Sequence, residues 1–140
     1  MANRWFNQFG KTLAKEVVSL YAQVSFGASG APTLVTTGTN STKTSQGIKS
    51  ISQNGTGDYT ITLQDPYYQL LWFGVAWDES SNSGSAPLAY SQSWVKARTV
   101  GTTSGGTIEF VTGGAAGAAT NPASGEIALI EIVVQNSNAV

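Results

Sequence analysis

The sequence predicts an all-β protein, a β-sandwich or jelly roll of about eight short antiparallel strands. Apolar and polar residues alternate with a period of two in several short segments, which is typical of half-buried strands. Turns rich in Gly, Pro, Asn and Ser separate these segments. No helical pattern alternates with the strands, so a βαβ architecture is excluded.

The clearest element is a hairpin over residues 46–64. Its second strand has an apolar side formed by Tyr59, Ile61 and Leu63. Ile48 and Ile51 mark the first strand, and their odd spacing indicates a bulge at Lys49–Ser50. The link Asn-Gly-Thr-Gly at 54–57 tolerates positive φ, so we expect a tight or slightly bulged turn.

Six further strands are expected, at residues 16–26, 33–37, 67–77, 88–100, 107–111 and 126–135. The first has an apolar side formed by Val18, Leu20, Ala22, Val24 and Phe26. The segment 67–77 is the most apolar run and is predicted to be buried on both faces. The segment 126–135 is also apolar on both faces, apart from Glu131. This exceeds what a small two-sheet core needs, so either loops cover one sheet or one face lies at an oligomer axis, and we favour the second.

Residues 1–14 are predicted to form an N-terminal arm or short helix, followed by a single β-sandwich domain over residues 15–140. Trp5, Phe6, Phe9 and Leu13 are spaced as on an amphipathic helix, although Gly10 weakens that prediction. An aromatic cluster ahead of the first strand either docks on another protein or packs under its own sheet.

Charged residues make up only 11% of the chain, compared with roughly 25% in ordinary soluble domains. The resulting neutral, hydrogen-bonding surface is common in virion, fibre and secreted β-proteins. A net charge of −1 gives no long-range attraction for nucleic acid or for an anionic membrane, so we expect neither partner. We expect no signal peptide and no membrane span, and therefore synthesis in a cytoplasm.

The chain contains no histidine and no cysteine, which excludes Ser-His-Asp and Cys-His catalysis, disulfides and the usual zinc ligands. Ser93 and Lys96 match an S-x-x-K motif, but they lie in an expected strand, which would place them on opposite faces. The loop 78–84 only superficially resembles a calcium loop. We therefore expect no enzymatic activity, no metal and no cofactor.

The aromatic residues of the later strands are candidates for sugar stacking, but they are more typical of a core. They are Tyr67, Tyr68, Trp72, Trp77, Tyr90 and Trp94. Trp77 and Tyr90 flank the polar loop 78–87, which is expected at the surface, so for these two the sugar-binding interpretation stays open.

Four stretches carry a resemblance to a known group of proteins. They are NRWFNQFGKTL, VVSLYAQVSFGASGAPTLV, QGIKSISQNGTGDYTITLQDPYYQLL and NPASGEIALIEIVVQNS. Together they resemble small structural proteins of tailed bacteriophages, including those of marine and cyanobacterial phages. The pattern G-I-x-S-I, a short turn and G-x-Y-x-I-x-L is also similar to strands of phage fibre and C1q-like jelly-roll modules.

This resemblance implies a virion protein made in the host cytoplasm, namely a capsid decoration (cement) protein on the capsid exterior. Such proteins sit on the phage head as trimers and clamp neighbouring subunits of the major capsid protein. Five residues are then expected to contact the capsid or a sister subunit: Arg4, Trp5, Phe6, Phe9 and Leu13. Ile130, Glu131 and Ile132 are candidates for the interface of the homotrimer. The alternative is a tail-fibre or receptor-binding module that recognises host surface glycans, with its site in the loop 78–85 and near Tyr90.

Overall fold

The computed structural model describes residues 17–35, 45–78, 92–99, 105–113 and 117–135. Within these ranges lie eight antiparallel strands, a three-residue 3-10 turn (Ala28–Gly30) and no α-helix. The strands are β1 (Val17–Phe26), β2 (Pro32–Val35), β3 (Ile48–Gly55), β4 (Asp58–Leu63), β5 (Gln69–Asp78), β6 (Gln92–Thr99), β7 (Thr107–Gly113) and β8 (Ile127–Gln135). The predicted arm over residues 1–14 lies outside the described residues.

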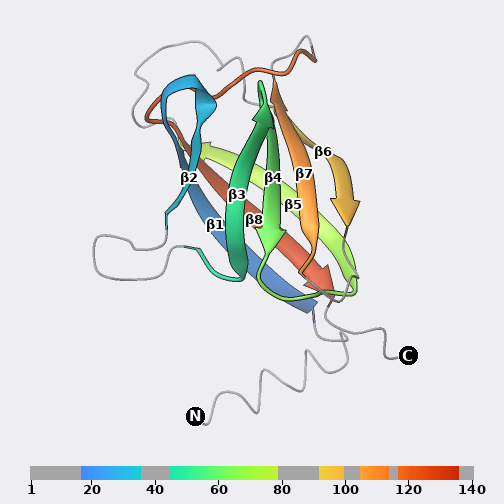
Figure 1. Cartoon of the computed structure of the whole chain (residues 1–140). Helices are drawn as coiled ribbons and strands as arrows, with labels where there is room; N and C mark the ends of the chain where they lie inside the picture. The colour runs from blue at the N-terminus through green and yellow to red at the C-terminus, as the bar shows by residue number, and fades with distance from the viewer. Residues whose placement is uncertain (1–16, 36–44, 79–91, 100–104, 114–116, 136–140) are drawn as a thin grey trace.

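The strands form two four-stranded sheets packed face to face (Figure 1). The first sheet has the order β2-β1-β8-β5, and the second has the order β3-β4-β7-β6. β1 pairs with β8 at the centre of the first sheet, so strands from opposite ends of the chain lie side by side there, and β4 pairs with β7 at the centre of the second. The predicted β-sandwich is confirmed.

One hydrophobic core fills the space between the sheets. The first sheet contributes alternate residues of β1 and β8, and the second contributes alternate residues of β4 and β7. The largest fully buried side chains include Tyr59, Ile61, Phe110, Ile130 and Ile132. The apolar side predicted for residues 16–26 does face this core.

The predicted hairpin forms as β3 and β4. The register shifts between Ile48 and Ser50, which confirms the bulge expected from the spacing of the isoleucines. A second shift between Gln53 and Gly55 precedes the two-residue turn, in which Gly57 has a φ of 64°. Positive φ at this position explains why the turn uses glycine.

A network of hydrogen bonds ties this hairpin to the loop before β8. Oδ1 of Asn121 accepts hydrogen bonds from the backbone amide of Gly57 at 2.6 Å and from the side-chain amide of Gln53 at 3.0 Å. Thr112 donates its hydroxyl to the Thr120 carbonyl at 2.7 Å and its backbone amide to Gly57. One end of the sandwich is therefore closed by polar side chains.

The prediction that residues 67–77 are buried on both faces is wrong. β5 is an edge strand, and only its inward residues, such as Leu70, Phe73 and Val75, pack against the core. Its outward residues Trp72 and Ala76 are exposed. Tyr68 and Trp94, which the pattern also favours as core residues, are likewise exposed, whereas Tyr67 is buried.

Candidate functional site

The outer face of the first sheet exposes large apolar side chains. Tyr21 on β1 is 52% exposed, Trp72 on β5 is 59% exposed and Leu129 on β8 is 46% exposed. Ala76 and the half-buried Val133 lie beside them on the same face. We call these five residues the outer apolar face.

The strand register places these residues in adjacent rows across the sheet. In one row, Ser19 of β1, Val133 of β8 and Trp72 of β5 lie side by side. The next row holds Tyr21, Glu131 and Gly74. These side chains stand on the outer face of a single sheet and form a surface.

The row of Tyr21, Glu131 and Gly74 contains a hydrogen bond between two side chains. The Tyr21 hydroxyl donates to Oε1 of Glu131 over 3.4 Å. The Trp72 indole lies over Gly74, since a β-carbon at Gly74 would stand 2.9 Å from the indole nitrogen. Glycine at position 74 thus leaves room for the indole above this position, which is paired with Glu131.

Next to this face, the sandwich opens along the edge strands β5 and β6. A cleft of about 510 Å³ separates the two strands, and each strand has a register shift beside it. The lining residues are Leu70, Leu71, Trp72, Phe73, Val95, Lys96, Ala97 and Arg98. Leu71, which is 46% exposed, and Tyr68, which is 51% exposed just before β5, extend the apolar surface around this edge.

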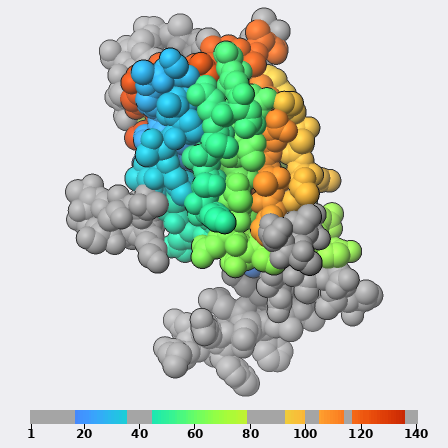
Figure 2. Space-filling model, in the orientation of Figure 1, coloured from blue at the N-terminus to red at the C-terminus, as the bar shows by residue number. Residues whose placement is uncertain are grey.

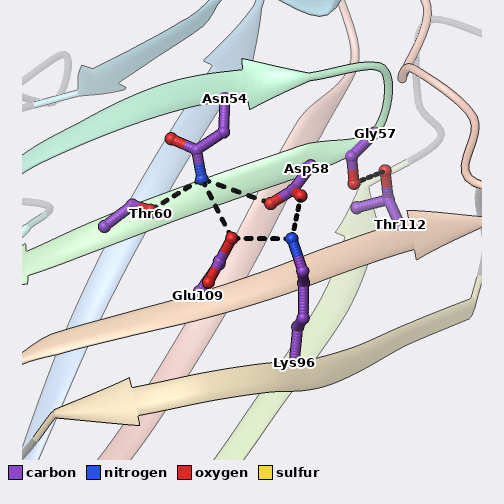
Figure 3. A network of polar contacts seen from close by, with 7 residues as sticks. All are labelled: Asn54, Gly57, Asp58, Thr60, Lys96, Glu109 and Thr112. Atoms are coloured by element: carbon purple, nitrogen blue, oxygen red, sulfur yellow. Dashed lines mark hydrogen bonds and ion pairs between the residues drawn. The ribbon is translucent and has the colours of Figure 1, made fainter.

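The outer side of the second sheet has a different character and forms a continuous surface from β3 to β6 (Figure 2). Here the Lys96 ammonium lies 2.6 Å from Oδ2 of Asp58 and 2.8 Å from Oε1 of Glu109 (Figure 3). The Asn54 side-chain amide donates to Thr60 at 2.8 Å and to Asp58 at 3.2 Å. Neighbouring strands therefore join through charged and amide groups.

This network keeps its charges in place and does not prepare an acid or a base. The hydrogen bond from Lys96 is the main reason that the pKa of Asp58 lies below its ordinary value. The same bonds to Asp58 and Glu109 raise the pKa of Lys96. Asp58 therefore stays ionised at neutral pH and Lys96 stays protonated, so neither group is poised for proton transfer.

The structure separates the two residues of the S-x-x-K motif, as the strand prediction required. Ser93 is paired with the buried Thr112, whereas Lys96 binds carboxylates on the outer side of the sheet. Among the described residues, no group of three or more Asp and Glu side chains is arranged to hold a metal ion. The described residues also contain no helix that could cross a membrane.

The predicted partner-binding residues lie in different parts of the chain. Arg4, Trp5, Phe6, Phe9 and Leu13 all fall outside the described residues. Ile130 and Ile132 point into the core with 2% and 0% exposure, whereas Glu131 lies on the outer face. A contact through β8 would therefore use Leu129, Glu131 and Val133.

The two aromatic residues proposed for sugar binding do not form a site in the described chain. Trp77 is half-buried against the core, with its ring 5.7 Å from that of Phe26. Tyr90 lies outside the described residues, as does the loop 79–85. Most of the predicted glycan site therefore falls in a part of the chain that the structure does not describe.

Two features of the sequence indicate the outer apolar face, which was not among the predicted sites. Tyr21 alternates with the core residues of β1, so its outward direction follows from the period of two. Leu129 belongs to a strand that is apolar on both faces.

Comparisons with protein-family models, with curated protein sequences and with solved structures give no match to this chain.

Proposed function

We propose that this chain is a structural protein of a bacteriophage particle. In this proposal it is a capsid decoration (cement) protein, which binds the outside of the head as a homotrimer and clamps neighbouring subunits of the major capsid protein. The resemblance of its strands and turns to small phage structural proteins supports the assignment to a bacteriophage particle. The physical properties of the surface support a role in assembly.

The observation that carries the proposal is the uneven distribution of exposed apolar side chains. Seven large hydrophobic residues of the described chain are exposed, and five of them lie on or beside the first sheet. They are Tyr21, Tyr68, Leu71, Trp72 and Leu129. Contiguous apolar surface of this kind marks sites of protein–protein contact.

The composition of this surface also fits a protein partner. Tyr and Trp are enriched among residues that dominate binding energy at protein interfaces. Only Glu131 and Asp78 carry a charge among the first-sheet strands, so this side has little of the electrostatic attraction that nucleic acid requires. A polymer-cleaving enzyme would need a groove with an acid and a base, and the described carboxylates on the second sheet are held by Lys96.

The aromatic N-terminal segment gives the proposal a second contact. Trp5, Phe6 and Phe9 would act as apolar anchors on the capsid or on a sister subunit. Three arms from one trimer would then raise the avidity of attachment without further contacts.

Co-sedimentation with capsids that lack the protein tests this function. We expect the full chain to bind at saturating stoichiometry, and we expect a chain lacking residues 1–13 to bind more weakly. A full chain that ignores capsids overturns the decoration role, and binding to isolated host envelopes would then support the glycan-recognition alternative. Undiminished capsid occupancy by the truncated chain overturns the role of the arm.

A further inference from the structure

The outer apolar face and the edge beside it are together large enough to form an interface with another protein. A fully exposed large side chain presents about 200 Å², so the exposed parts of Tyr21, Trp72 and Leu129 correspond to roughly 300 Å². Tyr68 and Leu71 add about 200 Å² on the adjoining edge. A standard interface takes about 800 Å² from each partner, of which roughly 450 Å² is apolar. The exposed apolar area therefore matches what one side of a stable complex needs.

The polar groups on this face complement one another, which favours a partner with the same surface. Glu131 has two carboxylate oxygens, of which Oε1 accepts from the Tyr21 hydroxyl within one copy, and the Trp72 indole N–H supplies a donor. Because all three lie on one face of the first sheet, two copies of that face can exchange hydrogen bonds across a contact. A contact between identical surfaces requires this kind of self-complementarity.

The charge distribution also favours a second copy of this chain as the partner. The two rows described above run from Ser19 to Trp72 and from Tyr21 to Gly74, and Glu131 is the only charged residue in them. Two copies therefore approach each other without opposing clusters of like charge. On the second sheet, by contrast, Lys96, Asp58 and Glu109 are already satisfied within one copy. The second sheet therefore suits exposure to solvent, and the first sheet suits burial against another copy.

We propose that the outer apolar face, together with the adjoining edge at Tyr68 and Leu71, is the interface between copies of this chain. Trp72 and Leu129 form its apolar centre, and Tyr21 and Glu131 supply hydrogen bonds that set the alignment of the copies. A contact between two identical faces joins copies in pairs about a two-fold axis, so it is additional to the three-fold contact of the proposed homotrimer, and the inference rests on the proposed function only for the purpose of the assembly. The contact itself forms without a capsid.

The test is the mass of the full-length protein in solution, measured by light scattering across a dilution series. We expect the unmodified protein to be an oligomer that dissociates on dilution. Trp72→Ser and Leu129→Glu should each weaken association by roughly 30-fold or more, as expected for loss of an interface hot spot. A protein that stays monomeric at the highest concentration overturns the proposal.

Matched substitutions on the second sheet serve as controls. Trp94→Ser removes another exposed tryptophan, and Ser52→Glu adds a charge at another exposed strand position. Both should leave the mass unchanged. Equal dissociation by variants of the two sheets would refute the assignment of the interface to the first sheet.

A further variant covers the case in which a substitution harms folding. Gly74→Ala adds one methyl group under the Trp72 indole and displaces it, while the other nearby atoms belong to the same exposed side chain. This variant should keep the circular dichroism spectrum of the unmodified protein and still associate more weakly. A displaced indole with unchanged association would contradict the role of Trp72.

Capsid binding by the same proteins separates this inference from the proposed function. If the unmodified protein is an oligomer but ignores capsids, the interface stands and the decoration role fails. If Leu129→Glu is monomeric and its capsid binding loses avidity, both stand. If the unmodified protein is monomeric and still binds capsids, the decoration role stands and the interface between copies fails.

Discussion

Replacing Tyr59 by phenylalanine removes one buried hydroxyl and keeps the aromatic ring. Tyr59 is fully buried, and its ring packs 5.4 Å from that of Phe26 and 5.5 Å from that of Phe110. Its hydroxyl donates to the carbonyl of Gly30 at 3.1 Å. The substitution therefore leaves the ring contacts in place and leaves the Gly30 carbonyl without this donor.

The effect on stability should change sign with pH. At pH 7 the lost hydrogen bond should lower the free energy of unfolding by about 1–2 kcal/mol. Burial raises the pKa of Tyr59 to about 12, whereas a tyrosine in the unfolded chain has a pKa near 10. Between these values the unfolded chain loses a proton that the folded protein keeps, so stability falls as the pH rises. Over the whole window the loss is about 2–3 kcal/mol, and phenylalanine does not share it.

Equilibrium urea unfolding of the two proteins, at pH values from neutral to strongly alkaline, measures this difference. The unmodified protein should be the more stable at pH 7, and its advantage should shrink above about pH 10 and reverse near pH 12. Tyr67, whose pKa is also raised by burial and by the charge of Asp65, contributes equally to both proteins and cancels in the comparison. A difference that stays constant across this range would refute the reasoning.

Two further predictions concern the second sheet. Gly57→Ala should cost about 2–4 kcal/mol in chemical unfolding, because φ is positive and a β-carbon would stand 2.6 Å from a backbone nitrogen; Gly55→Ala, which meets no atom within 4 Å, should change stability little, and an equal cost would contradict the steric argument. Lys96→Met should destabilise the protein at neutral pH, and the gap should close as the pH falls below about 4, because Lys96 lowers the pKa of Asp58 and that contribution disappears once the carboxyl is protonated. Lys49→Met, at another exposed position, is the control and should show no such pH dependence in thermal unfolding.

The local parts of the fold could be read from the sequence because short-range physics decides them. The hairpin of β3 and β4 needs only a period of two and a turn that tolerates positive φ. Its bulge between Ile48 and Ser50 follows from a single change of spacing. The inward side of β1 follows from strict alternation over ten residues.

Whether a sheet is covered on its outer side was beyond the reach of the pattern, and the error at β5 follows from it. An apolar run indicates burial on both faces only if the sheet is covered on both sides, and the outer face of the first sheet is exposed at the edge strand β5 and at the central strand β8 alike. The contacts of Lys96 could not be predicted from a local pattern either, because they join residues on β4, β6 and β7. Such contacts depend on the register between strands, which no local window contains.

The candidate site shows how sensitive a strand is to register. Along β8, Leu129, Glu131 and Val133 face outward while Ile130 and Ile132 face the core. All but one of these residues are apolar, so hydrophobicity does not distinguish the two faces. A shift of one residue exchanges them, and only the pairing with β1 and β5 fixes the choice. The sequence could therefore point to the strand, but not to the residues that it presents.

The charged residues of the strands are distributed unevenly between the two sheets, and this bears on assembly. The strands of the second sheet carry Lys49, Asp58, Lys96, Arg98 and Glu109, whereas those of the first carry only Asp78 and Glu131. Charges on exposed strands protect a sheet against association, so their scarcity leaves one sheet open to a partner while the other stays protected. The residues that hold the sandwich together face inward, and those available for assembly face outward. Stability and assembly should therefore respond to different substitutions along the same strands.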